Sequence, residues 1–536
     1  MLRAGIAAYR QGDYAEAAGL FRAVLGAQPD HHGARINLAN ALWSLGDYAK
    51  AAQQADIVRA ADPAFAEVWI ITGAIRLDRG DAGGAADAYA EAARLRPGAF
   101  AALAGLAAAF LATGQNEAAE RAAEEALALE PGNGHALFTL ASAKLARHQP
   151  EQALALFDRL ITAAPHHARA RHNRANALID LGRLDEAKIG LHASLALDPQ
   201  LKEAWATLGY LLTIEGDLPD AIAACDRAVA LDPDFAPGQW NRGVALLLRG
   251  DFAGGFAAYE WRKRHKLFRH HFTAMPGVAW QGENLAGKHL LVRAEQGFGD
   301  TLMLARFLPQ LASRVAKLTL CCPTSLFPLF RGFDIELREL NAPPAAPDFS
   351  VDQMSLPHIL NITEANIPFA AGYLQADPKR AEELGRALTG TKPRIGLVWA
   401  GNPGHDNDYH RSLPVGALAP LLAIPGISFV SLQIGSRQHE YAIQDAARLI
   451  RDYGDTAAML SQLDAVVTVD TSVAHLAGAL GVPCHVLLSK ACDWRWRLGR
   501  NDTAWYSSLT LHRQVRLDDW AVPITSVIAS LRQLLA

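Results

Sequence analysis

The chain has 536 residues, half of them apolar and 20% charged, which provides material for several packed domains and excludes global disorder. Lys and Arg number 51 against 55 Asp and Glu, and the formal charge of −4 argues against a protein that coats nucleic acid. The five cysteines lack CxxC or Cys/His spacing, which excludes a disulfide framework and a structural zinc site. No secretory signal or membrane-length apolar segment is visible, so we expect a soluble, cytoplasmic protein.

The first half of the chain repeats with a fixed period. Prolines recur at positions 29, 63, 97, 131, 165, 199 and 233. Glycines keep the same interval at positions 12, 46, 80, 114, 182, 216 and 250, with His148 in place of one of them. A glycine allows the positive φ that ends a helix, and a proline cannot continue one, so each period predicts two helices. The pattern is that of the tetratricopeptide repeat (TPR), and it predicts an all-α solenoid over residues 1–265 with a divergent last repeat from Asp234.

Asparagines recur on the first helix of several repeats. The candidate acceptor-binding residues are Asn37, Asn40, Asn173, Asn176 and Asn241. An amide offers donors and an acceptor, so these side chains suit a peptide backbone whatever its side chains are. The partial ladder resembles the asparagine ladder in the TPR superhelix of O-GlcNAc transferase. The alternative interpretation is that these residues are polar positions on a helix surface.

A basic run ends the repeats. It comprises Arg262, Lys263, Arg264, His265, Lys266, Arg269, His270 and His271. A charged linker whose cations pair with acidic groups is the favoured interpretation, and a patch for nucleic acid or anionic lipid is the alternative.

After residue 280 strands alternate with helices. The predicted strands are residues 288–294, 317–322, 335–340, 394–400, 428–434, 465–470 and 485–488. This alternation predicts two parallel sheets in Rossmann-like lobes, residues 275–388 and 389–536, with ligands beyond the carboxyl ends of the strands as in the GT-B architecture. Residues 341–357 are expected to run irregularly over the first lobe, and a helix near 378–388 to bridge the lobes.

Three loops at strand ends carry the candidate chemistry. In the first, EQGFGD at 295–300, two glycines allow a tight turn and leave Asp300 at a helix N-terminus, where it is expected as an N-cap, a position that is compatible with a catalytic role. In the second, residues 399–412, Arg411 and Ser412 precede a helix expected near Pro414, so a phosphate could meet a guanidinium and helix-end N–H groups. Asp406-Asn407-Asp408 in this loop also has the D-x-D pattern of a metal pair in another glycosyltransferase class, which is the less favoured interpretation.

The third loop, VDTSVAHLAGALGVP at 469–483, is the most informative segment. Asp470 ends a strand, Thr471 and Ser472 offer hydroxyls at a helix start, and His475 lies one turn into the helix. This combination suits a sugar phosphate, whereas an ordinary capped βα unit would not need all four side chains.

These residues resemble the heptosyltransferase-like (family 9) GT-B glycosyltransferases, over about residues 285–515. A TPR array fused to such a domain is similar to bacterial protein glycosyltransferases, including flagellin-modifying ones. The resemblance implies metal-independent, inverting transfer, with Asp300 as the general base. It also implies the donor-binding residues Asn402, Arg411, Ser412, Gln433, Asp470, Thr471, Ser472 and His475, and the tryptophan- and arginine-rich pattern near the end of the chain adds Trp494. Gln433 would lie at the edge of the nucleotide base, and Trp494, in the sequence DWRWRLGR, would border the donor or pack.

The predicted function is therefore transfer of a sugar from a nucleotide sugar to Ser or Thr hydroxyls of a protein captured by the TPR groove. Flagellin is the best single candidate for that acceptor, and neither a cofactor nor a nucleic-acid partner is expected. Two alternatives are an enzyme of lipopolysaccharide or other glycan assembly and a TPR adaptor with an inactive glycosyltransferase-like domain.

Overall fold

The computed structural model describes residues 1–266, 268, 272–340, 342, 346–404 and 408–535. Its contacts divide the chain into two compact units, Met1–Ala204 and Trp205–Ala536. The division falls within the repeats and not at residue 265, because side chains of the last repeat share a core with the sheets. None of the helices among the described residues is long and apolar enough to cross a membrane.

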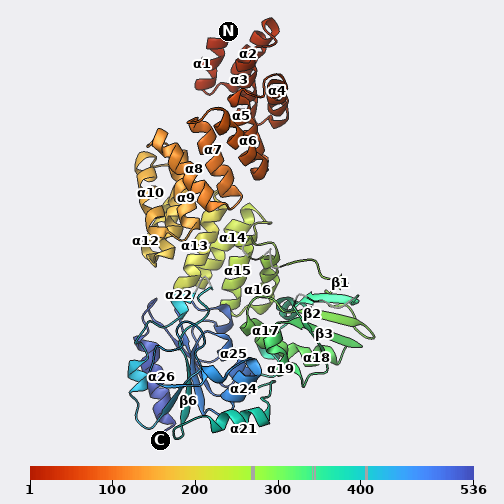
Figure 1. Cartoon of the computed structure of the whole chain (residues 1–536), viewed down its shortest axis with the longest axis vertical. Helices are drawn as coiled ribbons and strands as arrows, with labels where there is room; N and C mark the ends of the chain where they lie inside the picture. Colours follow the sequence, from red (N-terminus) through yellow and green to blue (C-terminus); the bar gives the residue numbers. More distant parts are fainter. Residues whose placement is uncertain (267, 269–271, 341, 343–345, 405–407, 536) are drawn as a thin grey trace. The chain divides into compact units, whose positions relative to one another are not determined.

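Helix pairs occupy residues 2–259, all of which the structure describes (Figure 1). They are α1 (Leu2–Arg10), α2 (Tyr14–Ala27), α3 (His32–Ser44), α4 (Tyr48–Ala61), α5 (Ala66–Asp78), α6 (Ala82–Leu95), α7 (Phe100–Ala112), α8 (Asn116–Leu129), α9 (Gly134–Ala146), α10 (Pro150–Ala163), α11 (Ala168–Asp180), α12 (Leu184–Leu197), α13 (Lys202–Glu215), α14 (Leu218–Leu231), α15 (Ala236–Arg249) and α16 (Phe252–Tyr259). The eight pairs confirm the predicted repeats, including the last one. A short 3-10 helix, η1 (Glu260–Lys263), follows them.

The periodic residues act as the repeat predicts. The seven glycines of the series all have positive φ, from 70° to 98°, and His148 has the same left-handed conformation, with φ 56°. Small residues allow close helix contacts: a Cβ on Gly5 would come 2.6 Å from the Phe21 ring, and one on Gly73 would come 2.8 Å from the Tyr89 ring. Each contact joins the two helices of one repeat, which explains the small residue at that phase.

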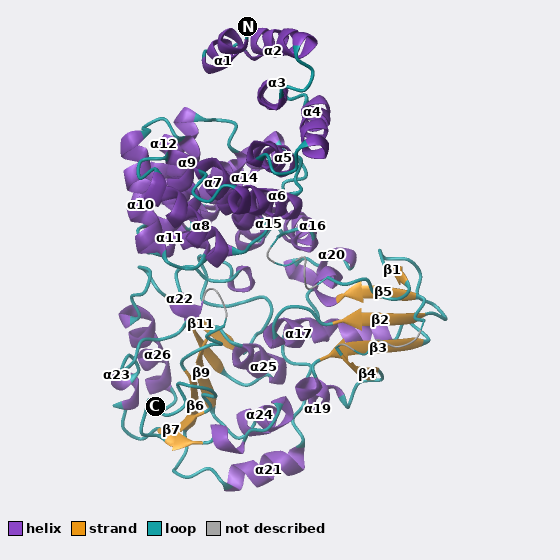
Figure 2. Cartoon of the chain, turned by 45° about the horizontal axis from the view of Figure 1, so that its top comes forward, coloured by secondary structure: helices purple, strands orange, loops and turns teal. Residues whose placement is uncertain are grey.

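Among its described residues, the first lobe contains a fully parallel sheet of five strands in the order β1-β5-β2-β3-β4, which lie side by side in Figure 2. The strands are β1 (Val278–Ala279), β2 (His289–Arg293), β3 (Lys317–Cys322), β4 (Glu336–Glu339) and β5 (Phe349–Asp352). Its helices are α17 (Phe298–Leu304), α18 (Leu308–Ala312), α19 (Phe327–Phe330) and α20 (Leu356–Ile359). The expectation of an irregular path through 341–357 was wrong from residue 349 onward, because β5 is an inner strand that pairs with both β1 and β2; residues 341 and 343–345 lie outside the described residues.

The second lobe contains a six-stranded parallel sheet in the order β11-β10-β9-β6-β7-β8. The strands are β6 (Arg394–Val398), β7 (Ser428–Ser431), β8 (Gln444–Asp445), β9 (Ala465–Val469), β10 (Cys484–Leu488) and β11 (Leu509–Arg513). Its helices are α22 (Asp408–Arg411), α23 (Ala419–Leu422), α24 (Tyr453–Leu460), α25 (Ser472–Leu480) and α26 (Ala521–Gln533). All seven predicted strands are present, whereas β1, β5, β8 and β11 were not predicted.

The two lobes contact each other at several places, and α19 of the first lobe packs on α24 of the second. Helix α21 (Pro378–Arg386), which connects the lobes in the sequence, also packs on α24, and Arg380 Nε lies 2.6 Å from Asp455 Oδ1. Helix α17 of the first lobe packs on α25 of the second. Because α17 and α25 each follow the carboxyl end of a parallel strand, their contact brings together the strand ends where ligands of such sheets bind.

Candidate active site

The first and third predicted loops meet at the contact between α17 and α25. A Cβ on Gly299 would lie 2.7 Å from Cδ2 of the His475 ring, so the glycine allows the two helices to approach this closely. Asp300 is the next residue of α17, and its Oδ2 accepts a hydrogen bond of 2.8 Å from the Gly297 amide. The N-cap residue is Gly297 and not Asp300 as expected; Asp300 is the third residue of the helix and closes a capping box, and its second carboxylate oxygen is directed elsewhere.

That second oxygen forms an ion pair with Arg495 of η8 (Trp494–Trp496), in the loop after β10. Arg495 also donates to Asp493 Oδ1 at 2.6 Å, and its guanidinium carbon lies 4.3 Å from the centroid of the Trp494 ring. Burial raises the pKa of Asp300, and the charge of Arg495 acts against that rise. The pair joins a side chain of the first lobe to one of the second.

A second carboxylate, Asp470, lies at the end of β9. Burial, followed by the negative charge of Asp493, raises the pKa of Asp470 to about 6. The guanidinium groups of Arg411 and Arg495 lower it in part, so both cations are electrostatically close to this carboxylate. Three carboxylates and two guanidiniums from four loops therefore share one region between the lobes.

The remaining residues of the third loop are held by side-chain contacts. Thr471 Oγ1 lies 3.0 Å from Thr468 Oγ1, and Ser472 Oγ lies 2.7 Å from the Tyr453 hydroxyl. His475 is a buried residue whose Nδ1 lies 3.1 Å from the hydroxyl of Tyr506, and burial holds its pKa well below its ordinary value. The ring of His475 also stacks on Trp496, with 5.1 Å between centroids. It is thus an uncharged, fixed imidazole.

The second loop differs from its prediction. Asn402 is exposed and accepts from the Gly404 amide at 3.0 Å, while Arg411 Nε donates to Asp408 Oδ1 at 3.1 Å. Ser412 Oγ accepts from the Gly401 amide at 2.9 Å. The helix expected near Pro414 was wrong, because α23 begins only at Ala419, so no helix-end N–H groups follow Arg411 and Ser412.

The structure describes only the last residue of the alternative metal motif, Asp406-Asn407-Asp408. Asp406 and Asn407 lie outside the described residues, and Asp408 is paired with Arg411. Over the part of the chain that the structure describes, no group of three or more His, Cys, Asp or Glu side chains is arranged to hold a metal ion.

Gln433 does not have the predicted geometry for a nucleotide base. Its side-chain oxygen accepts from the amides of Trp399 (3.0 Å) and Ala400 (2.9 Å). Its amide nitrogen donates to the carbonyls of Ala400 (3.2 Å) and Ile434 (3.0 Å). The side chain is buried and fully used, so it ties the loop after β6 to the end of β7, and the expectation of a base contact is corrected.

Trp494 is buried and packs against aromatic side chains. Its ring lies in edge contact with Phe256 and Tyr259 of α16, at centroid distances of 5.5 Å and 5.7 Å, and with Trp505 at 6.0 Å. These contacts agree with the packing interpretation of this tryptophan, and its ring also lies 4.3 Å from the guanidinium carbon of Arg495, the residue that pairs with Asp300.

Sequence reasoning did not find Tyr259, which the last repeat helix contributes to this region. Its hydroxyl lies 3.4 Å from Oε1 of Gln296 in the first loop, and Arg495, Asp493 and Asp300 all act on its pKa, which burial raises. Tyr259 has the repeat phase of Phe21 and Tyr89, so in the sequence it is indistinguishable from a packing residue.

The asparagines of the repeats are all partly exposed. Asn173 Nδ2 donates to Ser142 Oγ at 3.2 Å, and Asn241 Nδ2 donates to the carbonyl of Ala206 at 3.0 Å. Asn176 Nδ2 lies 3.4 Å from His172 Nε2. Asn173 and Asn241 thus use an amide hydrogen to tie their helix to the first helix of the preceding repeat, while Asn37 and Asn40 are half-buried on α3.

The basic run is largely paired with acidic groups. Arg262 pairs with Glu295 and Glu260, Lys263 pairs with Glu260, and Arg264 Nη1 lies 2.9 Å from Asp234 Oδ1. These contacts agree with the interpretation as a charged linker. Arg269, His270 and His271 lie outside the described residues.

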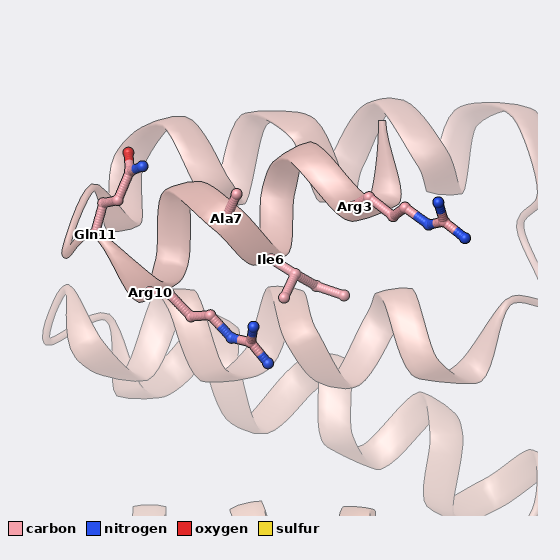
Figure 3. A pocket seen from close by; sticks show the side chains of 5 residues that line it. All are labelled: Arg3, Ile6, Ala7, Arg10 and Gln11. Atoms are coloured by element: carbon pink, nitrogen blue, oxygen red, sulfur yellow. The ribbon is translucent and has the colours of Figure 1, made fainter.

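A separate hollow of about 400 Å³ lies on α1 (Figure 3). It is lined by Arg3, Ile6, Ala7, Arg10 and Gln11. Its lining belongs to one helix and the residue that ends it, and includes neither an acid nor a nucleophile, so it is not a candidate for the chemistry described above.

Comparisons with known proteins bear on the helical part. A tetratricopeptide repeat family model matches residues 8–75 and 144–211, and a second one matches 191–236 and 215–260. The N-terminal part of the chain is a TPR solenoid. TPR solenoids present extended binding surfaces, so this part of the chain has a protein-interaction role.

Protein FlbA of Caulobacter vibrioides is 29% identical over 316 residues. The match covers 53% of this chain and 52% of FlbA, so the chain spans about half the length of this relative. Similar solved structures include a chain of the APC/C hetero-tetramer Cut9–Hcn1 (16% identity, 45% of this chain and 48% of that one, TM-score 0.42). A thermophilic TPR protein of Thermus thermophilus is 23% identical, covers 34% of this chain and 99% of its own, and has a TM-score of 0.32. YrrB, a TPR protein with an unusual peptide-binding site, is 21% identical (35% of this chain, 96% of its own, TM-score 0.28).

Proposed function

We propose that this chain is a glycosyltransferase that moves a sugar from a nucleotide sugar to a Ser or Thr hydroxyl of a protein held by the TPR solenoid. The observation that carries the proposal is the position of Asp300. This carboxylate comes from the first lobe and contacts Arg495 of the second lobe, at the ends of two parallel sheets. Ligands of parallel sheets bind at such ends, and a transferase of this kind needs one base between an acceptor and a donor.

The side chains support an inverting transfer in one step. The acceptor oxygen would attack the anomeric carbon while the bond from that carbon to the diphosphate breaks, and its proton would pass to Asp300. The electron pair of the broken bond leaves on the diphosphate, whose added charge Arg411 and Arg495 would stabilise. Burial raises the pKa of Asp300, which makes it a better proton acceptor than an exposed carboxylate.

The donor sugar is assigned to the start of α25, and the acceptor to the first lobe and the repeats. Asp470, Thr471 and Ser472 present a carboxylate and two hydroxyls beside His475, which suits the hydroxyl groups of a sugar. Tyr259 brings the last repeat helix to the same region, which supports an acceptor delivered by the repeats. Flagellin is the acceptor that we propose to test first, on the resemblance to flagellin-modifying enzymes.

The test combines donor hydrolysis and transfer in the full chain. We expect one of the UDP-, GDP-, ADP- or CMP-sugars to raise the melting temperature, and Asp300→Ala to lose transfer at least 100-fold while still binding that donor. Full activity of Asp300→Ala would refute the assignment of the base. The adaptor alternative predicts that no donor binds.

A truncation distinguishes a protein acceptor from a glycan acceptor. It should remove residues 1–204, because a cut at 233 would divide the second compact unit. We expect the truncated chain to hydrolyse the donor but to lose modification of the protein acceptor. Unchanged transfer to a glycan would instead favour the enzyme of glycan assembly.

A further inference from the structure

Arg495 is a nearly buried cation whose two terminal nitrogens bond to two different carboxylates. Its side chain is 7% exposed, and its two terminal nitrogens bond to different carboxylates, Nη1 to Asp493 and Nη2 to Asp300. Nη2 also lies 4.0 Å from Met354 Sδ. Its third nitrogen, Nε, is buried without a hydrogen-bond partner among the described residues. A guanidinium with a buried N–H that has no partner can donate one more hydrogen bond to an acceptor oxygen.

Each carboxylate oxygen of Asp300 has one contact in this arrangement. One of its oxygens accepts from the Gly297 amide, and the other is paired with Arg495. A general base must present a lone pair to the hydroxyl that it deprotonates, and a guanidinium partner makes a carboxylate a weaker base. Asp300 therefore becomes a stronger base when its contact with Arg495 is broken.

We propose that Arg495 is an exchangeable counter-ion that holds Asp300 in the unliganded protein and moves to the diphosphate of the donor, freeing Asp300. The inference rests on the proposed function, and it adds an order: the donor binds first, and only then is the base available to the acceptor. The exchange requires little movement of the arginine side chain, because Nη1 keeps its hydrogen bond to Asp493.

The chemistry of a diphosphate favours the exchange. Its oxygens match the planar fork of a guanidinium and carry more charge than one carboxylate. Arg411 acts on Asp470 together with Arg495, so a diphosphate beside Asp470 would be close to both cations. Nε of Arg495, unpartnered in the structure, would gain an acceptor.

The experiment measures nucleotide affinity in the full chain. UDP, GDP, ADP and CDP are titrated by calorimetry into the wild type, Asp300→Asn, Arg495→Gln and the double variant. Asparagine retains an oxygen for the Gly297 amide but no charge for Arg495, so the local helix cap survives. Glu364→Gln is the matched control, because it removes a carboxylate that pairs with Arg497 and Arg500 of the same loop but not with Arg495.

The exchange predicts that Asp300→Asn binds the preferred diphosphate about 3- to 30-fold more tightly than the wild type. Arg495→Gln should weaken binding at least tenfold, and Asp300→Asn should give no gain when Arg495 is already replaced. Glu364→Gln should stay within twofold. Unchanged or weaker binding by Asp300→Asn, or unchanged binding by Arg495→Gln, would overturn the exchange. If no diphosphate binds to any variant, the exchange fails; the proposed function fails as well only if none of the UDP-, GDP-, ADP- or CMP-sugars raises the melting temperature.

Arg495→Lys checks that the Arg495→Gln result does not come from misfolding. It keeps the positive charge but lacks the fork, so affinity should fall between those of the wild type and Arg495→Gln. Affinity equal to the wild type would show that no bidentate contact forms, and would overturn the exchange as drawn.

Discussion

Arg262 donates to both carboxylate oxygens of Glu295, from Nη2 to Oε1 at 2.7 Å and from Nε to Oε2 at 3.0 Å. The arginine side chain is 0% exposed and the glutamate side chain 4%. Arg262 belongs to the turn after the last repeat helix, whereas Glu295 begins the loop that carries Asp300. A buried bidentate pair thus fixes the start of the site loop against the end of the repeats.

Replacement of Arg262 should destabilise the second compact unit strongly. Arg262→Ala leaves Glu295 buried without its partner, at a cost of about 3–5 kcal/mol in the free energy of unfolding. Arg262→Lys should recover only part of this, because an ammonium cannot bond both oxygens as the fork does. Urea unfolding gives both values. Arg264→Ala, which breaks the exposed pair with Asp234, should cost less than about 1 kcal/mol, and equal losses for the two alanine variants would contradict the prediction.

Much of the fold could be predicted from the sequence because helix ends and buried strands both leave patterns within a few neighbouring residues. The left-handed helix ends need glycine, so the period was visible, and strands such as β6 and β9 are continuous apolar runs. Strand β5 was missed because its four residues, FSVD, have weak patterning and follow a segment rich in proline and alanine. Pairing with two neighbours, and not its own composition, makes it a strand.

Gly299→Ala should separate the two lobes at the site. The new Cβ would lie 2.7 Å from the ring of His475, which cannot retreat because it stacks on Trp496 and bonds to Tyr506. We expect a net loss of about 1–2 kcal/mol, since overpacking outweighs the better helix propensity of alanine. Thermal unfolding measures it. Gly332→Ala meets no atom within 4 Å and should be neutral; a neutral Gly299→Ala would mean that the helices do not pack so closely.

Asp470 should give the protein a measurable loss of stability as pH rises. Its folded pKa of about 6 lies above the ordinary 3.8, so between these values the folded state binds the proton more tightly, and stability falls as pH rises through about 6. Asp470→Asn removes this penalty. The difference in the free energy of unfolding between the variant and the wild type should therefore shift by about 1–3 kcal/mol in favour of the variant from pH 4 to pH 8.

The control for Asp470 has the opposite sign. The His289 amide and Lys288 lower the pKa of Asp348, so its contribution is present at neutral pH and is lost as pH falls. Asp348→Asn should therefore be least stable relative to the wild type at neutral pH. Parallel pH profiles for Asp470→Asn and the wild type would contradict the raised pKa.

Asp455 should stabilise the contact between α21 and the second lobe. It is buried and lies 2.6 Å from Arg380 Nε and 2.8 Å from Arg451 Nε, and its pKa is held well below its usual range. Asp455→Asn should cost about 3 kcal/mol at pH 7, and the difference from the wild type should shrink as the pH falls toward 3. Glu383→Gln removes an exposed partner of the same Arg380 and should cost under about 0.5 kcal/mol. A loss that does not vary with pH would exclude the ion pair as its cause.

The candidate site was only partly predictable, because its residues come together by contacts distant in sequence. Asp300, Asp470 and His475 follow strands, where ligand-binding residues are expected. Whether Gln433 faces a ligand or the backbone depends on where the loop after β6 turns, which local patterns do not encode. Tyr259 joins the site only because the last repeat packs on the second lobe.

The left-handed turn at His148 offers a prediction for the first unit. His148 has φ 56° and is exposed, at the position where the other repeats have glycine. Because a side chain in this conformation is strained, His148→Gly should stabilise the unit by about 0.5–1 kcal/mol, even though glycine increases the entropy of the unfolded chain. The reverse change, Gly114→Ala at φ 78°, should destabilise it by about 1 kcal/mol. Urea unfolding of both variants tests the pair. A destabilised His148→Gly would show that the imidazole makes a compensating contact, through the nearby Asp180 on which its charge acts.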